Sequence, residues 1–272
     1  MQTMTAATER TTRIALPRLR AEGQGDDVYL SIIVPTWNGG NRLPDTLRSL
    51  SLFARDLPFV AERIVIDDCS DPSTAQVLAD WQRHDPAMRV VRNDRNSGKG
   101  YSVARGMAIA RGRYRVFLDA DLAYPATEIS KILAELEGGA DVAIACRTDS
   151  RSRYLMSPAY FHYLYTRHLM SRFFNLLVRM TLLPGIADTQ AGLKGFTARA
   201  SAEIFPNLTI NRFGFDLECL FIARRRAMII AQTPVEFHYN NEPSTVHFVR
   251  DVCTMLRDIA VVRWRGWRRR YG

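Results

Sequence analysis

The sequence predicts an α/β protein built around one mainly parallel β-sheet with helices on both faces. From about residue 29 onward, short apolar segments typical of buried strands alternate with segments whose leucines recur at helical spacing. Strand–helix–strand order requires crossover connections, so consecutive strands run parallel and the helices cover the sheet. The chain has 272 residues, of which 47% are hydrophobic and 24% charged, enough apolar material for one large domain.

Each expected element follows from a local pattern. The first strand is an apolar run that ends at Pro35, and the helix after it carries Leu43, Leu47 and Leu50 at helical spacing. The second strand is apolar and ends in acids at Asp67. The same reasoning predicts strands at 30–35, 63–67, 88–91, 114–118 and 141–145, and helices at 42–54, 72–81, 100–110 and 126–136.

The two ends of the chain differ from this central region. Residues 1–28 are expected to form a flexible leader, residues 29–240 the main domain, and residues 241–272 a basic, aromatic C-terminal helix or tail. We find no signal peptide and no stretch of about 18 uninterrupted apolar residues that could span a membrane. The cysteines stand too far apart for a zinc site or a disulfide framework. We therefore expect a reduced, cytoplasmic protein.

The formal net charge of +9 comes almost entirely from arginine, because Lys99, Lys131 and Lys194 are the only lysines. The planar guanidinium can bind a phosphate through two parallel hydrogen bonds, so nucleic acid, a nucleotide or a phospholipid surface would each suit this composition. A coding bias toward arginine would produce the same composition. Charge alone therefore does not choose a partner.

Two carboxylates one residue apart, Asp119 and Asp121, follow the predicted strand 114–118. The carboxyl ends of parallel strands meet at one edge of the sheet, where Asp67 and Asp68 also fall. Hard divalent cations prefer oxygen ligands and keep positions open for substrate phosphates. Such a pair can therefore hold Mg²⁺ or Mn²⁺ against a nucleotide diphosphate, although Asp-X-Asp on its own is also typical of a solvated turn.

Several segments recur in a characteristic order: SIIVPTWN at 31–38, IVIDDCS at 64–70, residues 93–100, and Asp119-Ala120-Asp121. Together they resemble family 2 glycosyltransferases, which have the GT-A, Rossmann-like fold. Further segments are DTQAGLKGF at 188–196, FDLE at 215–218, and PVEF at 234–237 followed by Ser244. These resemble the dolichyl-phosphate β-glucosyltransferase branch, sister to the dolichyl-phosphate mannose synthases. The matches span roughly residues 29 to 270.

The resemblance implies a nucleotide-sugar donor site at the strand ends. The residues implied to bind the base and ribose are Pro35, Thr36, Asn38, Asp67 and Asp68. Asn96 and Lys99 would lie near the diphosphate. Asp119 and Asp121 would meet ribose, metal and diphosphate, with Asp121 favoured as the direct metal ligand.

One departure from the mannose synthases bears on the donor. Those enzymes carry a glutamine metal ligand two residues after the second aspartate, whereas this chain has Ala123. The glucosyltransferase branch also has alanine there, which favours UDP-glucose over GDP-mannose. The metal would then lack one protein ligand, so water or another residue must complete its coordination.

An acceptor site is expected around residues 154–183, an aromatic, apolar and basic segment whose periodicity predicts amphipathic helices. Such a helix can lie in a membrane interface, and a core helix has the same stripe. Arg147, Arg167 and Ser171 resemble the positions that bind the lipid phosphate in mannose synthases, although the spacing from Arg147 is longer here. Arg167 and Ser171 lie one helical turn apart and can bind one anion together.

The C-terminal residues 261–271 contain five arginines, two tryptophans and no acid. This composition suits an anionic membrane leaflet with aromatic anchors, and it would also attract RNA. The expected location is therefore the cytoplasmic face of a membrane, with peripheral attachment.

The resemblance thus implies an inverting enzyme that moves a hexose, glucose above all, from a UDP-sugar to a polyprenyl or dolichyl phosphate. A phosphate acceptor is already ionised, whereas a hydroxyl acceptor would need a general base. The candidate catalytic carboxylates are Asp119, Asp121, Asp188 and Asp216, and Glu218 is a further carboxylate near the acceptor.

Two other interpretations stay open. The first keeps the donor chemistry but has a soluble small-molecule acceptor, which the lack of the family's usual transmembrane anchor supports. The second is a basic module that binds nucleic acid or membrane without chemistry, and the intact set of acid motifs argues against it.

Overall fold

The computed structural model describes residues 28–85, 87–155, 177–238, 248–268 and 271, with the side chains of 248–253 excepted. Within these residues a seven-stranded sheet has the order β3-β2-β1-β4-β7-β5-β8, and a separate pair joins β6 to β9. The strands are β1 (Leu30–Thr36), β2 (Ala61–Asp67), β3 (Met88–Arg92), β4 (Tyr114–Leu118), β5 (Val142–Ala145), β6 (Arg153–Leu155), β7 (Leu193–Thr197), β8 (Ile230–Thr233) and β9 (Glu236–His238).

The large sheet is parallel apart from one internal strand. β1 pairs parallel with β2 and β4, β2 with β3, and β5 with β8. β7 runs antiparallel to both of its neighbours, β4 and β5. Its sequence includes Lys194 and Gly195, which interrupt the apolar run, so the strand was not predicted. A Cβ at Gly195 would lie 2.4 Å from a methyl of Ile132, so glycine allows α4 to pack closely on this strand.

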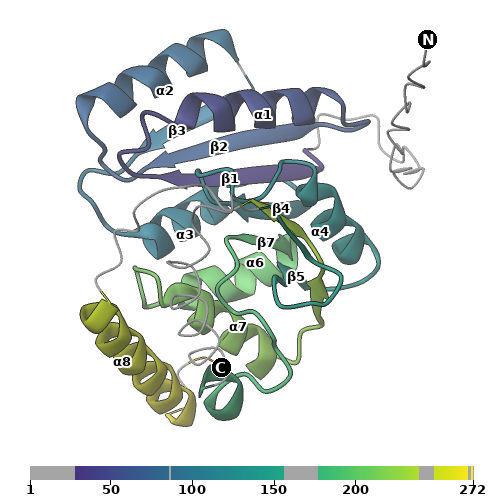
Figure 1. Cartoon of the computed structure of the whole chain (residues 1–272), viewed down its shortest axis with the longest axis vertical. Helices are drawn as coiled ribbons and strands as arrows, with labels where there is room; N and C mark the ends of the chain where they lie inside the picture. The colour runs from purple at the N-terminus through teal and green to yellow at the C-terminus, as the bar shows by residue number, and fades with distance from the viewer. Residues whose placement is uncertain (1–27, 86, 156–176, 239–247, 269–270, 272) are drawn as a thin grey trace, which may run out of the picture.

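Helices cover both faces of the sheet, as Figure 1 shows. The helices are α1 (Leu43–Arg55), α2 (Pro72–His84), α3 (Lys99–Ile109), α4 (Glu128–Glu137), α6 (Ala198–Ile204), α7 (Phe215–Arg225) and α8 (Phe248–Trp267), and a short 3₁₀ turn covers Phe205–Asn207. The apolar residues of α1, α2 and α4 join one buried cluster, and those of α3, α6, α7 and α8 join the other. The sheet therefore separates two hydrophobic cores.

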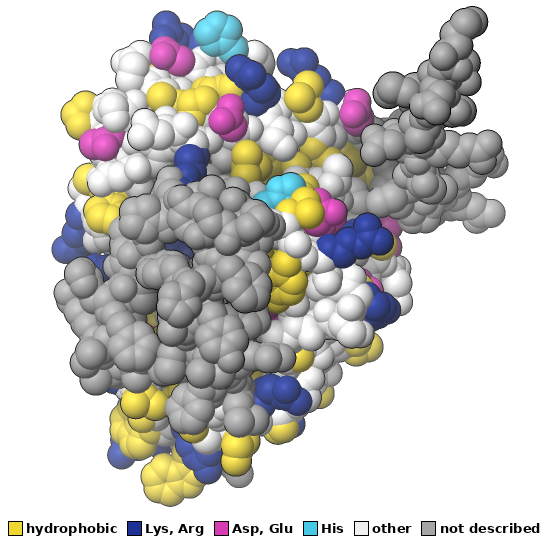
Figure 2. All heavy atoms as spheres, viewed as in Figure 1, with side chains coloured by type: hydrophobic (Ala, Val, Ile, Leu, Met, Phe, Trp, Pro, Cys, Tyr) yellow, Lys and Arg dark blue, Asp and Glu magenta, His cyan; other side chains and the backbone are white. Residues whose placement is uncertain are grey.

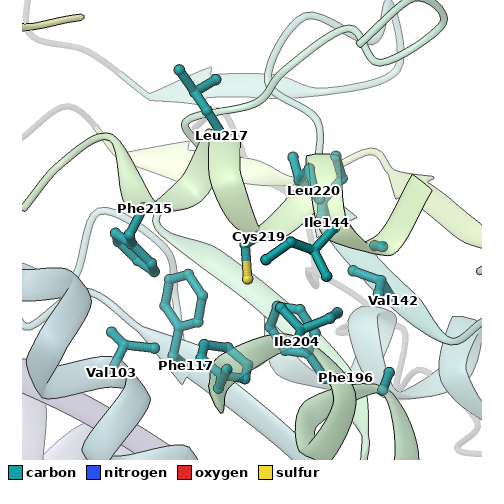
Figure 3. Close-up of a cluster of buried hydrophobic side chains, with 14 of the residues drawn as sticks. Val103, Phe117, Val142, Ile144, Phe196, Ile204, Phe215, Leu217, Cys219 and Leu220 are labelled. Atoms are coloured by element: carbon teal, nitrogen blue, oxygen red, sulfur yellow. The ribbon is translucent and has the colours of Figure 1, made fainter. Parts of the chain in front are cut away.

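The second core holds the helices that follow β7 against the sheet. Figure 3 shows the Cys219 sulfur among Phe117, Ile144 and Ile204, all of which are fully buried. The rings of Phe117 and Phe215 lie 5.7 Å apart, which fixes the start of α7 against β4.

The predicted elements are confirmed, with boundaries shifted by a few residues. The largest shift is at α2, which continues to His84. This helix begins where the Asp71 side chain accepts a hydrogen bond from Thr74 N at 2.8 Å, with Pro72 in the first turn.

The C-terminal segment 241–272, expected to be a helix or tail, contains helix α8. The predicted leader lies almost wholly outside the described residues, and so does most of the predicted helical segment 154–183, of which residues 177–181 are helical. No helix in the described part of the chain combines the length and apolar character that a bilayer crossing requires.

Candidate active site

The predicted donor residues converge at the carboxyl ends of β1, β2 and β4. Thr36 and Asp67 end paired strands, and the Asp68 N–H donates to the Thr36 carbonyl at 2.9 Å. The Thr46 hydroxyl of α1 donates to the Ala120 carbonyl at 2.8 Å. This bond fixes the loop that carries Asp119 and Asp121 against the end of the neighbouring helix.

Asp67 and Asp68 are buried and engaged by protein groups. Asp67 accepts a hydrogen bond from Ser70 N at 2.9 Å and forms an ion pair with Arg92. Asp68 accepts hydrogen bonds from Asn93 Nδ2 at 2.7 Å and from the backbone N–H groups of residues 97 and 98 at 2.8 and 2.7 Å. Asp68 therefore holds the loop that leads into α3.

The end of β1 has a different character. Asn38 adopts a positive φ of 52°, and its side chain accepts a hydrogen bond from Asp71 N at 2.8 Å. Pro35 is half-buried beside Thr36. Among the described residues, the buried Thr36 hydroxyl has no hydrogen-bond partner, which leaves a polar group for a ligand to satisfy.

Lys99, in the first turn of α3, reaches the acid pair. Its Nζ lies 2.6 Å from Asp119 Oδ1, and its ammonium lies 5.8 and 5.9 Å from the ring centroids of Phe117 and Phe215. Burial alone would lower the pKa of Lys99, but the carboxylates of Asp119 and Asp216 raise it above its ordinary value. Lys99 is thus a fixed positive charge at the strand ends.

The acid pair is crowded and partly shielded from water. Burial and the charge of Asp119 raise the pKa of Asp121, whose carboxylate also accepts a hydrogen bond from Ala123 N at 3.0 Å. A Cβ at Gly192 would lie 2.1 Å from Asp119 Oδ2, so only glycine leaves room for this carboxylate. A bound cation would relieve the repulsion between the two acids.

The oxygen donors at this edge fit a magnesium-type site. No group of three or more His, Cys, Asp or Glu residues that could hold a metal occurs within the described residues. Mg²⁺ commonly uses one or two carboxylates and completes its shell with waters and substrate phosphates. Asp119 and Asp121 can meet this requirement, whereas a structural zinc site would need more protein ligands.

Asp188 is buried and pairs with Arg147, whose side chain is 24% exposed. Arg147 Nε and Nη2 contact the two Asp188 oxygens at 2.7 and 2.9 Å, and Arg147 N donates to Oδ2 at 3.0 Å. Burial would raise the pKa of Asp188, but the Arg147 guanidinium outweighs it and lowers the pKa. A general base needs a pKa near the working pH, so this environment suits Asp188 to orienting Arg147.

Asp216 is paired with a lysine that the sequence analysis did not single out. Lys194, on β7, is fully buried and donates to Asp216 Oδ1 and to the Ala191 carbonyl, each at 2.6 Å. The pairing joins α7 to β7, the antiparallel strand between β4 and β5.

The structure thus brings the predicted donor residues together at one edge, with Asn96 in the wall of an adjoining cavity of about 680 Å³. Arg147 is paired with Asp188, and Arg167 and Ser171 lie outside the described residues.

Two further side chains at this edge were not predicted. The positive charge of Arg42 partly opposes the rise in the pKa of Asp121, and Trp37 is 57% exposed directly after β1. Trp37 directly follows two predicted donor residues in the segment at 31–38, and this position could have indicated it from the sequence. Arg42 stands before the first turn of α1, where no spacing rule marks it.

A match to a known family covers the predicted donor residues at the carboxyl ends of the strands. Residues 31–205 match the family described as "Glycosyl transferase family 2". The chain belongs to this family. It is a glycosyltransferase, as the sequence predicted, and the matched region includes every predicted donor residue but ends before Asp216.

Curated relatives cover most of the chain. A dolichyl-phosphate beta-glucosyltransferase of Dictyostelium discoideum is 33% identical over 250 residues, which cover 88% of this chain and 75% of the relative. Enzymes with the same name from Mus musculus and Saccharomyces cerevisiae are 34% and 26% identical, over 76% and 92% of this chain and 67% and 78% of their own lengths.

Solved structures confirm the predicted GT-A fold. Mannosyl-3-phosphoglycerate synthase from Rubrobacter xylanophilus has a TM-score of 0.65 at 16% identity, over 89% of this chain and 74% of that one. Glucosyl-3-phosphoglycerate synthase from Mycobacterium tuberculosis, solved with Mn²⁺, UDP and glucosyl-3-phosphoglycerate, has a TM-score of 0.58 at 17% identity, over 86% and 78%.

Proposed function

We propose that this glycosyltransferase transfers a hexose, glucose in the first instance, from UDP-glucose to the phosphate of a polyprenyl or dolichyl phosphate. The observation that carries the proposal is the convergence of Lys99, Asp119 and Asp121 at the carboxyl ends of the strands. The names of the relatives supply the sugar and the lipid phosphate.

The donor half of the reaction needs charge neutralisation at the diphosphate. Asp119 and Asp121 would hold Mg²⁺ or Mn²⁺, which when bound stabilises the charge that develops on the departing UDP. Lys99 contributes a further positive charge from the start of α3. Thr36 and Asn38 would contact the nucleoside, while Asp67 and Asp68 keep the pocket walls in place through their protein partners. Asn96 would border the diphosphate.

The acceptor half needs alignment more than proton transfer. A phosphate oxygen is ionised at neutral pH and can attack the anomeric carbon from the side opposite UDP, which inverts its configuration. Asp188 holds the Arg147 guanidinium through two side-chain hydrogen bonds and so presents it in a fixed orientation. Arg167 and Ser171 would complete the acceptor phosphate site. In this proposal Asp188 is a positioning residue and Asp216 neutralises Lys194.

The proposal includes peripheral attachment to the cytoplasmic face of a membrane, and the charge at one end of the molecule supports contact with an anionic lipid surface. Segments 177–187, 219–229 and 259–268 contain arginines but no Asp or Glu. They meet because Arg263 donates to the Thr181 carbonyl at 3.0 Å and Arg224 to the Pro184 carbonyl at 2.7 Å. Arg226 and Arg265 lie within ion-pair distance of Glu203 and Glu218 in other segments. An anionic lipid surface would neutralise the remaining positive charge.

Exposed apolar side chains accompany this basic end. Met180 and Trp267 are 76% and 80% exposed, and Trp264 is 43% exposed. Figure 2 shows hydrophobic and basic side chains together at the lower end of the view, where α8 ends in Figure 1. Tryptophans beside arginines suit the headgroup region of a bilayer.

The experiment that tests the function measures UDP release from UDP-glucose with Mn²⁺ or Mg²⁺, with and without a short-chain polyprenyl phosphate in detergent. Release that requires the lipid phosphate is the expected result. Binding of UDP without lipid-dependent release would favour a soluble acceptor instead. Failure to bind UDP at all would overturn the proposal.

A further inference from the structure

A buried carboxylate outside the proposed catalytic groups lies behind the donor site. Glu218, in the first turn of α7, is fully buried. Its Oε2 accepts hydrogen bonds from the backbone N–H groups of Thr209 and Ile210, each at 2.8 Å, and its Oε1 accepts one from the Thr209 hydroxyl. A buried carboxylate with this set of donors fixes the loop that supplies them.

The C-terminal end of the chain completes this cluster. The Tyr271 hydroxyl donates to Glu218 Oε1 at 2.7 Å, and Tyr271 is itself only 1% exposed. Arg265 Nη1, on α8, lies 3.8 Å from the same oxygen. Gly266 makes the approach possible, because a Cβ there would lie 2.5 Å from the Phe221 ring of α7. Residues about 50 positions apart along the chain therefore share one buried charge.

The loop that Glu218 fixes packs directly on the turn that carries Lys99. Tyr101 N donates to the Asn211 carbonyl at 3.2 Å. A Cβ at Gly98 would lie 2.4 Å from the same carbonyl oxygen, and a Cβ at Gly100 would lie 2.7 Å from the Ile210 carbonyl oxygen. Since backbone meets backbone on both sides of Lys99, a shift of the loop displaces the start of α3.

A second contact links α7 to Lys99. The Phe215 ring, one turn before Glu218, lies 5.9 Å from the Lys99 ammonium. Lys99 in turn contacts Asp119, one of the proposed metal ligands. The route from the C-terminus to the diphosphate site thus consists of adjacent contacts that begin at the buried pair Tyr271 and Glu218 and end at the partly exposed Lys99.

We infer that Glu218, held by Tyr271, is a positioning residue: through the loop that it fixes, it determines where the Lys99 ammonium lies relative to the donor diphosphate. This inference rests on the donor part of the proposed function. The C-terminal residues then act on nucleotide binding although they lie outside the matched family region, which ends at residue 205.

The test compares two tyrosine variants that each lose a hydrogen bond to a glutamate. Tyr271→Phe removes the bond to Glu218, and Tyr29→Phe removes a bond of the same length, 2.7 Å, from Tyr29 to Glu137 at a remote part of the sheet. UDP affinity is measured by calorimetry with Mg²⁺, alongside kcat, the KM for UDP-glucose and the melting temperature.

We expect Tyr271→Phe to weaken UDP binding by about 5-fold, as for weakly coupled sites, and to raise the KM for UDP-glucose by a similar factor with little change in kcat. Tyr29→Phe should bind UDP like the unmodified protein. Glu218→Gln, which disturbs all of the bonds to the carboxylate, should have a larger effect than Tyr271→Phe.

Three results would contradict the inference. Tyr271→Phe with a lowered melting temperature but unchanged UDP affinity would reduce the cluster to a structural role. Equal losses of UDP affinity in Tyr29→Phe and Tyr271→Phe would have the same meaning. An unmodified protein that does not bind UDP would overturn the proposed function, and with it the donor site to which the inference refers.

Discussion

Two lysine–aspartate pairs lie against the ring of Phe117. Comparing them distinguishes a pair suited to ligand binding from a pair that stabilises the fold. Lys99 to Asp119 and Lys194 to Asp216 have the same N–O distance of 2.6 Å, and the ammonium groups lie 5.8 and 5.5 Å from the centre of Phe117. The side chains of the first pair are 19% and 29% exposed, whereas those of the second are 0% and 5% exposed.

The difference in access gives the two pairs different capacities. A pair that reaches solvent can exchange its partner for an incoming phosphate or cation, while a sealed pair has lost its hydration and keeps its partner. Lys99 is therefore suited to the donor diphosphate, and Lys194 holds α7 on the sheet. Equal distances do not imply equal roles.

The largest expected effect comes from breaking the sealed pair. Lys194→Met leaves Asp216 buried without the ammonium that it contacts, so the free energy of unfolding should fall by about 3 to 5 kcal/mol. Urea denaturation measures the loss. The control is Arg83→Met, in an ion pair with Asp80 whose two side chains are 70% and 46% exposed, which should cost less than about 1 kcal/mol. Similar losses in the two variants would contradict the distinction.

The solvent-accessible pair of Lys99 and Asp119 should show the opposite pattern, with a loss of activity and little loss of stability. Lys99→Met should lower kcat/KM by about 100-fold, because a charge aimed at the leaving group is lost. Its melting temperature should stay close to that of the unmodified protein. The UDP-release assay and thermal unfolding check both parts. If Lys99→Met were as unstable as Lys194→Met while remaining active, the two pairs would have exchanged roles.

The arginine-rich surface formed by segments 177–187, 219–229 and 259–268 is a third case, because these segments contain no Asp or Glu. Replacing both Trp264 and Trp267 by alanine should weaken binding to phosphatidylglycerol vesicles by about 10-fold, because both anchors of the interface are removed. Co-sedimentation with vesicles gives the affinity, and UDP binding should not change. Leu52→Ala, at a residue 56% exposed on α1, is the control. Undiminished vesicle binding would place the membrane surface elsewhere.

The smallest expected effect is on the pH dependence of stability. It concerns Glu62, a buried carboxylate that has no lysine partner within the described residues and is stabilised by hydrogen bonds instead. Burial alone would raise the pKa of Glu62, but hydrogen bonds from Ser31 Oγ at 2.6 Å and Arg111 N at 2.7 Å, together with the charge of Arg111, hold the pKa below its ordinary value. The stabilisation is therefore present at neutral pH and is lost as the pH falls through the lowered pKa of the folded state.

Glu62→Gln should accordingly flatten the acid limb of the unfolding free energy against pH. Urea titrations between about pH 7 and pH 3 measure the slope. Asp56→Asn, at an exposed position after α1, serves as the control. An unchanged slope in Glu62→Gln would show that Glu62 has the same proton affinity in both states.

The sequence predicted the elements of the N-terminal half and the strand-end positions of its acids well, because both follow from local patterns. Leucine spacing gave α1, and acids directly after apolar strands gave the positions of Asp67 and Asp119. The predicted roles of these residues in binding stay predictions.

The later half depends on contacts that no short window contains. β7 was not predicted because Lys194 breaks its apolar pattern, and that lysine is tolerated only because Asp216, 22 positions away, neutralises it. The partners of Glu218 come from the loop before α7 and from Tyr271, 53 positions away. Burial creates these pairings, and burial is a property of the assembled fold.

The place of β7 in the sheet also has a consequence for synthesis on the ribosome. β4 and β5 precede β7 in the chain, yet β7 lies between them. Until residues 193–197 have emerged, the nascent sheet lacks its central connection, and the carboxylate of Asp119 lacks the wall formed by Gly192. A fragment that stops before this strand contains every strand-end acid of the donor site on the directly paired strands β2, β1 and β4, but it lacks the strand that borders β4 and the Gly192 wall beside Asp119. Nucleotide binding should therefore begin only after residues 193–197 have emerged.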